Sequence, residues 1–363
     1  MRILNIILLS VLCIICSCYY NEPIPADKNV WPVASPEEVD MIQEKLLQMD
    51  SAILVQPGQS INSVVIVKSG HLVYEKYYNS YTREDFFNLG GVGIIMSNLA
   101  LGKAIEMGLI ESVDDSLYKY LPDFKDEFDK FPMKKNITFR HLMTMKSGLS
   151  WNELSGLFGD SLNDLEKLEL SENWVEFIIT KPLDAVPGSR YSFNSATPVL
   201  LSAAIESQYK SGIKSFLLDE VLNAININNL EIERINGNAN TGWGISMATL
   251  DLVKVGYLYL EQGNWFGDQT LNSDFVESST SPQTNIDYFN NFGWMWWRYA
   301  DGSRFLYFLE ENDTFFAAGN GENRLYIVPH LDLVVAFTGA ETRQDLDIPA
   351  PLYFRDYILR SIQ

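Results

Sequence analysis

The sequence predicts an α/β (α+β) fold, because β-rich runs near both ends of the chain enclose a long segment with helical patterns. Three observations lead to this prediction. Two β-rich runs lie close together within residues 63–78, helical patterns dominate residues 86–284, and further β-rich runs follow in residues 292–338. A chain of 363 residues with 47% hydrophobic content can also bury a large core.

The chain begins with a segment that we do not assign to the fold. Arg2 precedes an apolar run at residues 3–15, and Ile15-Cys16-Ser17-Cys18 resembles a bacterial lipoprotein box. This pattern predicts a signal peptide at residues 1–18, cleavage before Cys18 and lipid attachment to Cys18. The protein is then expected to be lipid-anchored in the bacterial cell envelope, on the periplasmic or the surface side. An ordinary signal peptide with incidental cysteines is the alternative.

Residues 19–34 contain three prolines, which indicates an extended tether between the lipid anchor and the folded body. All three cysteines lie at or before Cys18, so the folded body offers no thiol for a disulfide, a metal ion or nucleophilic catalysis. The formal net charge of −20 argues against binding to nucleic acid or to anionic lipid through charge. It is typical of a solvated acidic surface.

The first elements of the folded body are a helix and a hairpin. Residues 36–49 have helical spacing after Ser35, which is a suitable N-cap. Residues 63–67 and 72–78 are β-rich runs separated by Lys68-Ser69-Gly70-His71, a pattern that predicts a β-hairpin.

The next element, at residues 92–107, is predicted to be a helix that is apolar nearly all round and therefore buried. Gly108 follows it, where a left-handed C-cap favours glycine. A further helix is predicted within residues 137–149, with Thr138 as cap and Gly148 at the end.

The C-terminal part returns to strands and ends in a helix. The β-rich runs are separated by Gly, Asp and Pro, and they occupy residues 292–297, 305–308, 325–328 and 331–338. Residues 352–362 are predicted to form a closing helix that packs on the sheet.

The segment at residues 86–110 resembles the central helix of the superfamily of serine β-lactamases, penicillin-binding proteins and related esterases. In that superfamily S-x-T-K-S precedes an apolar helix that ends in Gly-Leu-Ile, as Gly108-Leu109-Ile110 does here. Residues 114–122, 137–149 and 242–263 also resemble superfamily segments, the second being close to T-x-R-H-L-L-T-M-T-S-G-L.

The resemblance covers residues 35–362 and implies a β-lactamase/transpeptidase-like domain. Its five-stranded antiparallel sheet would come from residues 35–85 and 285–362, and the inserted helical region from residues 86–284.

Acyl transfer in the superfamily needs a serine at the start of the buried helix, a lysine three residues later, and a tyrosine in a Y-x-N motif. Matching the Gly-Leu-Ile ending places Gly91 at the serine position and Ile94 at the lysine position. In the segment resembling P-G-x-x-F-x-Y-N-S, Phe193 occupies the tyrosine position. The three positions therefore lack the catalytic side chains of the superfamily. Tyr191, after a local shift, is an alternative to Phe193.

The remaining cleft residues follow from the same resemblance. Asn194 and Ser195 complete the second motif, and the third, resembling F-x-A-x-G-Y-G-G-Q, contributes Gly319, Asn320, Gly321 and Glu322. A carboxylate at Glu322 would repel a substrate that carries a carboxylate. The alternative is that Glu322 points into solvent.

Other candidate sites have less support. Ser116 to Lys119 and Ser211 to Lys214 read S-x-x-K, but both lie in segments that resemble surface loops or helix starts. The three histidines have no ligand at metal-binding spacing; they are His71, His141 and His330. No glycine loop has the G-x-G-x-x-G spacing. We therefore predict neither a metal nor a cofactor.

Three readings of function remain. The first is a catalytically inactive pseudo-hydrolase that is anchored to the membrane through Cys18 and binds an envelope peptide, glycan, small molecule or protein. The second is an active serine hydrolase with a non-standard nucleophile; the serines considered are Ser97, Ser192 and Ser195. The third is a structural lipoprotein with a closed cleft. An open cleft at Gly91, Phe193 and Gly319 would favour binding, and a collapsed one the third reading.

Overall fold

The computed structural model describes residues 31–56, 60–153, 163–301, 303–340 and 349–363. Its centre is an eight-stranded antiparallel sheet in the order β10-β11-β12-β13-β14-β15-β1-β2. Its strands are β10 (Thr284–Asn285), β11 (Asn290–Phe292), β12 (Trp297–Tyr299), β13 (Phe315–Ala318), β14 (Arg324–Val328), β15 (Leu333–Gly339), β1 (Ile61–Lys68) and β2 (His71–Tyr77). The predicted hairpin is confirmed, because β1 and β2 pair with Lys68 opposite His71.

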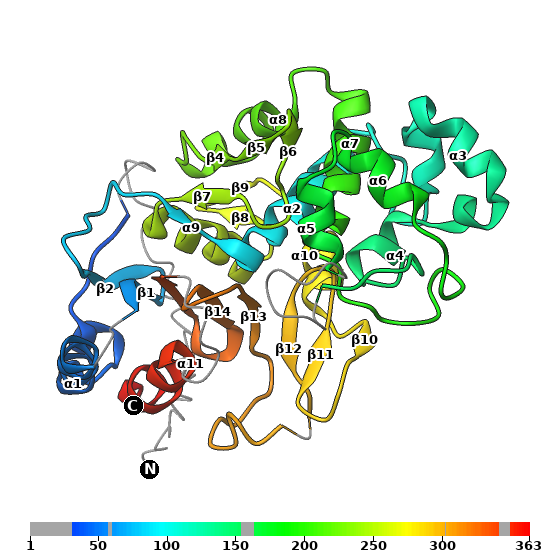
Figure 1. Cartoon of the computed structure of the whole chain (residues 1–363). Helices are drawn as coiled ribbons and strands as arrows, with labels where there is room; N and C mark the ends of the chain where they lie inside the picture. Colours follow the sequence, from blue (N-terminus) through cyan, green and yellow to red (C-terminus); the bar gives the residue numbers. More distant parts are fainter. Residues whose placement is uncertain (1–30, 57–59, 154–162, 302, 341–348) are drawn as a thin grey trace, which may run out of the picture.

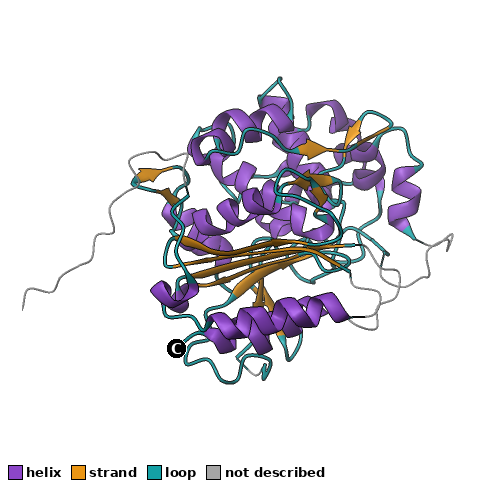
Figure 2. Ribbon diagram, turned by 90° about the vertical axis from the view of Figure 1, so that its left-hand side faces the viewer, coloured by secondary structure: helices purple, strands orange, loops and turns teal. Residues whose placement is uncertain are grey.

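The sheet is buried on both faces, and side chains of β1 alternate between two hydrophobic cores. Val64 and Ile66 face the core beneath α1 (Gln43–Val55) and the C-terminal helical segment, whereas Val65 and Val67 face the core shared with the helical region. Figure 2 shows the sheet between these two layers. The C-terminal segment joins α11 (Pro349–Tyr353) to a π-helical turn at Phe354–Ile358 and a 3-10 turn at Leu359–Ser361.

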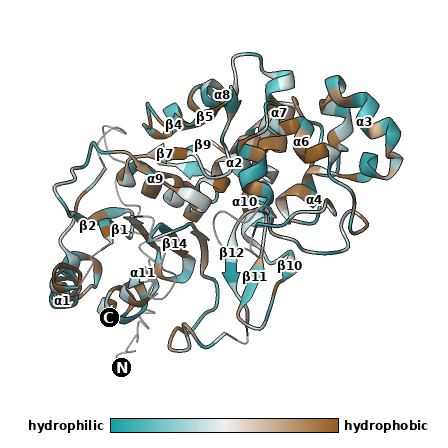
Figure 3. Cartoon of the chain, viewed as in Figure 1, coloured by the Kyte–Doolittle hydropathy of each residue, from teal (hydrophilic) through white to brown (hydrophobic). Residues whose placement is uncertain are grey.

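The helical region covers the other face, with α9 packed directly on β15, β1 and β14 (Figure 1). Its helices are α2 (Ile95–Glu106), α3 (Lys125–Lys130), α4 (Phe139–Met143), α5 (Asp164–Glu169), α6 (Trp174–Thr180), α7 (Thr197–Gln208), α8 (Ile213–Glu220), α9 (Thr249–Leu260) and α10 (Ser273–Thr280). Hydrophobic colours mark α6 and α7 in Figure 3, and hydrophilic ones mark α3. Among the described residues, no helix combines the length and the hydrophobicity needed to cross a membrane.

Short ribbons complete the helical region. They are β3 (Phe87–Asn88), β7 (Ile245–Met247) and β4 (Glu231–Ile232) in one sheet, β5 (Arg234–Ile235) with β6 (Asn238–Ala239), and β8 (Asn264–Trp265) with β9 (Asp268–Gln269). The buried central helix is confirmed as α2, preceded by a 3-10 turn, η2 (Gly90–Ile94). Gly108 has a φ of 71°, as expected for a left-handed cap.

Several predicted elements differ in the structure. The expected helix at residues 36–49 is two pieces, because Asp40 adopts a left-handed conformation between a 3-10 turn (Pro36–Val39) and α1. The run at residues 292–297 is a tight hairpin rather than one strand: Met295 has a φ of 64°, and Gly293 N donates to Trp296 O at 2.7 Å. Residues 305–308 form a turn.

The sheet has eight strands instead of the five implied by the resemblance, because the short strands β10, β11 and β12 extend its ladder beyond β13. The two chain ends of the fold also meet. Met41 bridges to Ile362, and Ile42 N donates to Ser361 O at 2.7 Å.

Most of the predicted N-terminal segments, including Cys18, lie outside the described residues. The last part of the expected tether, however, packs on the fold. The ring of Trp31 makes edge contacts with Tyr257 and Trp265 at centroid distances of 5.4 and 5.3 Å. Ala34 N also donates to Leu72 O at 3.2 Å. Aromatic burial therefore brings the chain into the fold by residue 31.

Candidate active site

The start of the buried helix is held by β3 and β7. Leu89 N donates to Ile245 O at 2.8 Å, and Gly90 N donates to the side-chain Oδ1 of Asn88 at 2.7 Å. Gly90 has a φ of 52°, a conformation that glycine adopts at little cost. These contacts direct residue 91 toward the end of β13.

The end of β13 lies directly against this turn, backbone to backbone. A Cβ added at Gly91 would lie 2.8 Å from the carbonyl oxygen of Ala318 and 3.4 Å from the Cα of Gly319. A Cβ added at Gly319 would lie 2.5 Å from the carbonyl oxygen of Leu89 and 2.9 Å from the nitrogen of Gly91. Neither position has room for a side chain in this arrangement. The cleft expected between Gly91 and Gly319 is closed at this point.

The turn after β13 is fixed by its own hydrogen bonds. The side-chain Nδ2 of Asn323 donates to the carbonyls of Asn88 and Asn320 at 3.2 and 3.0 Å, and its Oδ1 accepts from Gly339 N at 3.2 Å. The guanidinium of Arg324 donates to the carbonyls of Gly319 and Asn323, both at 2.6 Å. The turn is thus bound to β3 and β15, which holds β13 against Gly91.

Glu322 does not point into solvent, since it is only 1% exposed. Its carboxylate accepts from Ser60 Oγ at 3.1 Å and from Ala350 N, at the start of α11, at 2.9 Å. Burial raises the pKa of Glu322, while the hydrogen bonds from Ala350 and Ser60 and the charge of Arg324 act in the opposite direction. Its carboxylate therefore holds α11 and the Ser60 segment together.

Ile94 and Phe193 both belong to the hydrophobic interior shared with the helical region. Ile94 is 2% exposed, and the ring of Phe193 stacks on Trp297 at a centroid distance of 6.3 Å. Trp297 pairs in turn with Phe316 of β13. Apolar packing occupies the positions where the resemblance implies a lysine and a tyrosine.

Asn194 and Ser195 have local roles. The Oδ1 of Asn194 accepts from Ala196 N at 2.8 Å, which shapes the start of α7. Ser195 Oγ donates to Glu153 Oε1 at 2.7 Å, and Ser195 N donates to Glu153 Oε2 at 3.0 Å. Trp151 Nε1 also donates to Glu153 Oε2, at 2.6 Å.

The partnership of Ser195 with Glu153 was not predicted, because 42 residues separate them. Burial raises the pKa of Glu153, and the hydrogen bonds from Trp151 and Ser195 lower it by less. The only signal in the sequence was the position of Glu153 shortly after the helix at residues 137–149. That signal does not identify its partner.

The other candidate nucleophiles and proton donors are not brought into a reactive group. Ser97 is 2% exposed inside α2, and its hydroxyl has no hydrogen-bond partner in the described part of the chain. The hydroxyl of Tyr191 is likewise buried without a partner there, and burial raises its pKa. Lys119 pairs with Asp115 at 2.6 Å, whereas Ser116 Oγ donates to the carbonyl of Lys135.

Comparisons with known proteins agree with this architecture. A family model described as Beta-lactamase matches residues 58–347, which is most of the chain. Beta-lactamase-like protein 4 of Dictyostelium discoideum is 30% identical over 171 residues, which are 40% of this chain and 29% of that protein. The chain therefore spans less than a third of that curated relative.

Two solved structures share the fold. One is titled "Putative 6-aminohexanoate-dimer hydrolase from Bacillus anthracis"; its TM-score is 0.71 at 17% identity, covering 92% of this chain and 87% of that one. The other is the octameric penicillin-binding protein homologue from Pyrococcus abyssi, with a TM-score of 0.64 at 17% identity, covering 87% and 75%. At these identities the likeness concerns the fold alone.

Proposed function

The chain belongs to the beta-lactamase family, and from that membership we propose that it is a family member without acyl-enzyme chemistry, anchored in the bacterial envelope through a lipid on Cys18. The observation that carries this proposal is the approach of Ala318 and Gly319 to Gly91. An acyl-enzyme needs a nucleophilic side chain and a group that takes its proton. Gly91 has no side chain, and Ile94 and Phe193 cannot transfer protons.

A closed cleft also bears on where a ligand would bind. The side chains of the turn at residues 319–323 form hydrogen bonds with β3, with β15 and within the turn, so few of their donors and acceptors remain for a ligand. An open hollow of about 620 Å³ lies instead beside β10, β11 and β12. We call it the edge hollow; its lining residues are Asn285, Asp287, Tyr288, Asn291, Ala300 and Asp301.

The chemistry of the edge hollow suits a glycan. Some of its polar groups already bond within the loop, since Asn285 Nδ2 donates to Asn291 Oδ1 and Asp287 Oδ1 accepts from two backbone nitrogens. A carboxylate has about four acceptor sites, however, so the carboxylates of the hollow can accept further hydrogen bonds from hydroxyl groups. Tyr288 is 63% exposed, so its ring can lie against the apolar face of a sugar. We therefore propose that the protein binds an envelope glycan at the edge hollow.

The loss of acyl transfer is tested by intact-mass spectrometry of the full chain after incubation with a fluorophosphonate probe and, separately, with a penicillin. We expect no covalent adduct. The triple variant Gly91→Ser, Ile94→Lys, Phe193→Tyr is run alongside. Because β13 occupies the space beside residue 91, this variant is also expected to stay unlabelled. An adduct on the parent protein would refute the proposal, whereas an adduct on the variant alone would refute only the closed cleft.

Glycan binding is tested by sedimentation with purified peptidoglycan sacculi. We expect the parent protein to co-sediment and Tyr288→Ala to lose most of that binding. Tyr307→Ala is the matched control, since Tyr307 is 72% exposed and lies outside the hollow. Absence of co-sedimentation, or equal loss in both variants, would contradict the glycan proposal and favour a purely structural lipoprotein.

One observation favours a second candidate function, a hydrolase that uses Ser195. Its hydroxyl donates to the buried carboxylate of Glu153 at 2.7 Å, and a carboxylate with a raised pKa can act as a general base. The same probe experiment decides this case. An adduct that maps to Ser195 and disappears in Glu153→Gln would establish it. Without an adduct, Glu153 is only a clamp on the loop before α7.

A further inference from the structure

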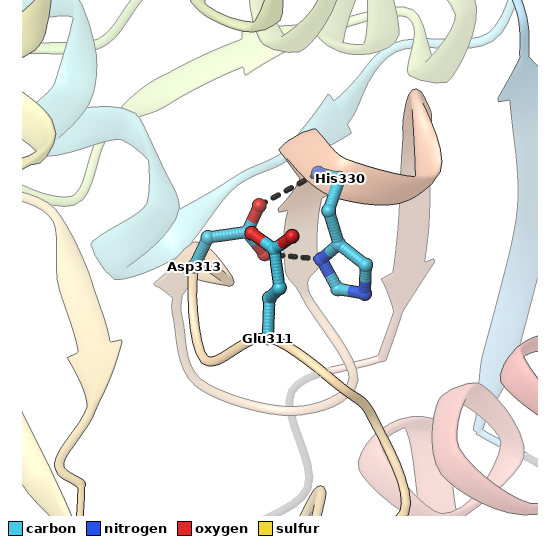
Figure 4. A group of neighbouring side chains, drawn as sticks. All are labelled: Glu311, Asp313 and His330. Carbon is cyan, nitrogen blue, oxygen red and sulfur yellow. Dashed lines mark hydrogen bonds and ion pairs between the residues drawn. The ribbon is translucent and has the colours of Figure 1, made fainter.

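Three potential metal ligands that are remote in sequence meet at one end of the sheet. Glu311, Asp313 and His330 each place a ligand atom within 4.8 Å of the other two (Figure 4). Glu311 and Asp313 lie in the segment that enters β13, and His330 lies in a 3-10 turn, η7 (Pro329–Leu331), between β14 and β15. Because β13 and β14 pair antiparallel, the segment that enters β13 and the turn after β14 lie at the same end of the sheet.

The local backbone explains how the three side chains converge. Glu311 and Asp313 are two residues apart in an irregular segment just before β13, and side chains at this spacing point to the same side when the chain is extended. The Oδ2 of Asp313 accepts from the backbone nitrogen of His330 at 2.6 Å, and its Oδ1 lies 2.6 Å from the ring Nδ1 of the same residue. Asp313 therefore orients the imidazole, whose side chain is only 12% exposed.

In the described part of the chain, the charges of this group are only partly balanced by cations. Within the described part of the chain, neither carboxylate forms an ion pair with a lysine or an arginine; the one charge partner is His330. Arg298 is close enough for Asp313 to affect its pKa, but its guanidinium donates to the carbonyls of Thr280 and Asn312, at 3.1 and 3.0 Å. Two neighbouring carboxylates in a chain of net charge −20 favour a bound cation.

We propose that Glu311, Asp313 and His330 form a zinc site. One imidazole nitrogen and two carboxylate oxygens are a ligand set that Zn²⁺ accepts, leaving a fourth position for water. The ion would take the place of the proton that His330 Nδ1 shares with Asp313 Oδ1, and that proton would be released to solvent. Mg²⁺ and Ca²⁺ prefer oxygen-only sites, so the imidazole favours zinc. The ion would tie the segment that enters β13 to the turn between β14 and β15. It would stabilise the folded state by mass action, because the three ligands come together only after folding.

The site is tested by titrating Zn²⁺ into the full chain in a calorimeter after its three cysteines have been alkylated. We expect one ion per chain, a rise in melting temperature on adding zinc, and reversal by EDTA. His330→Gln and Glu311→Gln should each weaken binding at least about tenfold. Glu310→Gln, an exposed neighbour with the same charge change, and His71→Gln are the controls that should bind as the parent does.

A second readout identifies the ligands directly. Co²⁺ bound in place of zinc absorbs visible light strongly when four- or five-coordinate, and this band should be lost in His330→Gln. Glu311 is exposed, so its variant reports on binding even where His330→Gln folds poorly. The proposal is overturned if the parent shows no saturable binding. It is equally overturned if His330→Gln and Glu311→Gln bind as tightly as Glu310→Gln, because the ion would then lie elsewhere.

Discussion

Restoring a serine at position 91 is the most direct perturbation of the closed cleft. Its Cβ would lie 2.8 Å from the carbonyl oxygen of Ala318, so β13 or the turn before α2 must move. Overpacking of this kind typically costs about 1–3 kcal/mol. Per-residue entropies of unfolding make 1 kcal/mol worth about 1.5 °C in a chain of this size, so Gly91→Ser should lower the melting temperature by about 2–5 °C. Gly319→Ala meets three backbone atoms within 3.0 Å, and it should cost more.

The assay is calorimetric or fluorescence-detected melting of the parent, of Gly91→Ser, of Gly319→Ala and of the double variant. Both substitutions push apart the same pair of backbones, so the second should cost less once the first is present. We expect the double variant to be at least about 0.5 kcal/mol more stable than the sum of the single effects predicts. The steric argument is refuted if Gly91→Ser has the same melting temperature as the parent. It is also refuted if the losses of stability in Gly91→Ser and Gly319→Ala add up in the double variant.

Three further predictions concern buried polar groups. Burial raises the pKa of Glu322 above the unfolded value of 4.5. The protonated side chain therefore stabilises the fold fully below pH 4.5, and this stabilisation is lost as pH rises through the folded pKa. Glu322→Gln does not titrate, so its melting temperature should rise relative to that of the parent between about pH 4 and 7. Tyr259→Phe removes the hydroxyl that donates to Asn98 inside the core, which should cost about 1–3 kcal/mol, seen as a lower urea midpoint at unchanged m-value. Asn323→Ala removes three hydrogen bonds of the turn after β13 and should cost about 2–4 kcal/mol in the same assay, and Asn323→Asp should cost at least as much, because a buried carboxylate oxygen would face the carbonyl oxygens of Asn88 and Asn320 to which Nδ2 now donates.

Local patterns predicted the elements whose signals lie within a few neighbouring residues. The hairpin of β1 and β2 follows from β-branched runs around Gly70, and the burial of α2 follows from its apolar surface. The left-handed cap at Gly108 was predicted for the same reason. In these cases propensity, hydrophobic period and turn chemistry favour the same conformation.

The predictions failed where a distant contact decides the local conformation. Residues 292–297 have strand propensity throughout, yet they turn back because Met295 N donates to Met143 O at 3.0 Å and Trp296 is buried. Glu322 has the composition of a surface turn, but Ser60 and Ala350 satisfy its carboxylate in the interior. No spacing along the chain carries that information.

The candidate site divides in the same way. The missing side chain at Gly91 is visible in the sequence, but its consequence depends on which backbone approaches it. The sequence does not show that Gly319 supplies that backbone, or that Glu153 reaches Ser195. The grouping of His330 with Asp313 was also missed, because spacing rules for metal ligands look only at neighbouring positions.

The contact of Gly91 with Gly319 also restricts the routes by which the protein could change. Glycine is required at each position as long as the opposite backbone stays in place. A side chain there would meet main-chain atoms, which cannot move aside by a change of rotamer as a side chain can. A single mutation toward a nucleophile at position 91 is therefore expected to lower the stability of the fold. Laboratory selection for acyl transfer that starts from this chain would first need mutations that move the end of β13 away from residue 91. The pair of glycines therefore makes a return to a serine at this position difficult.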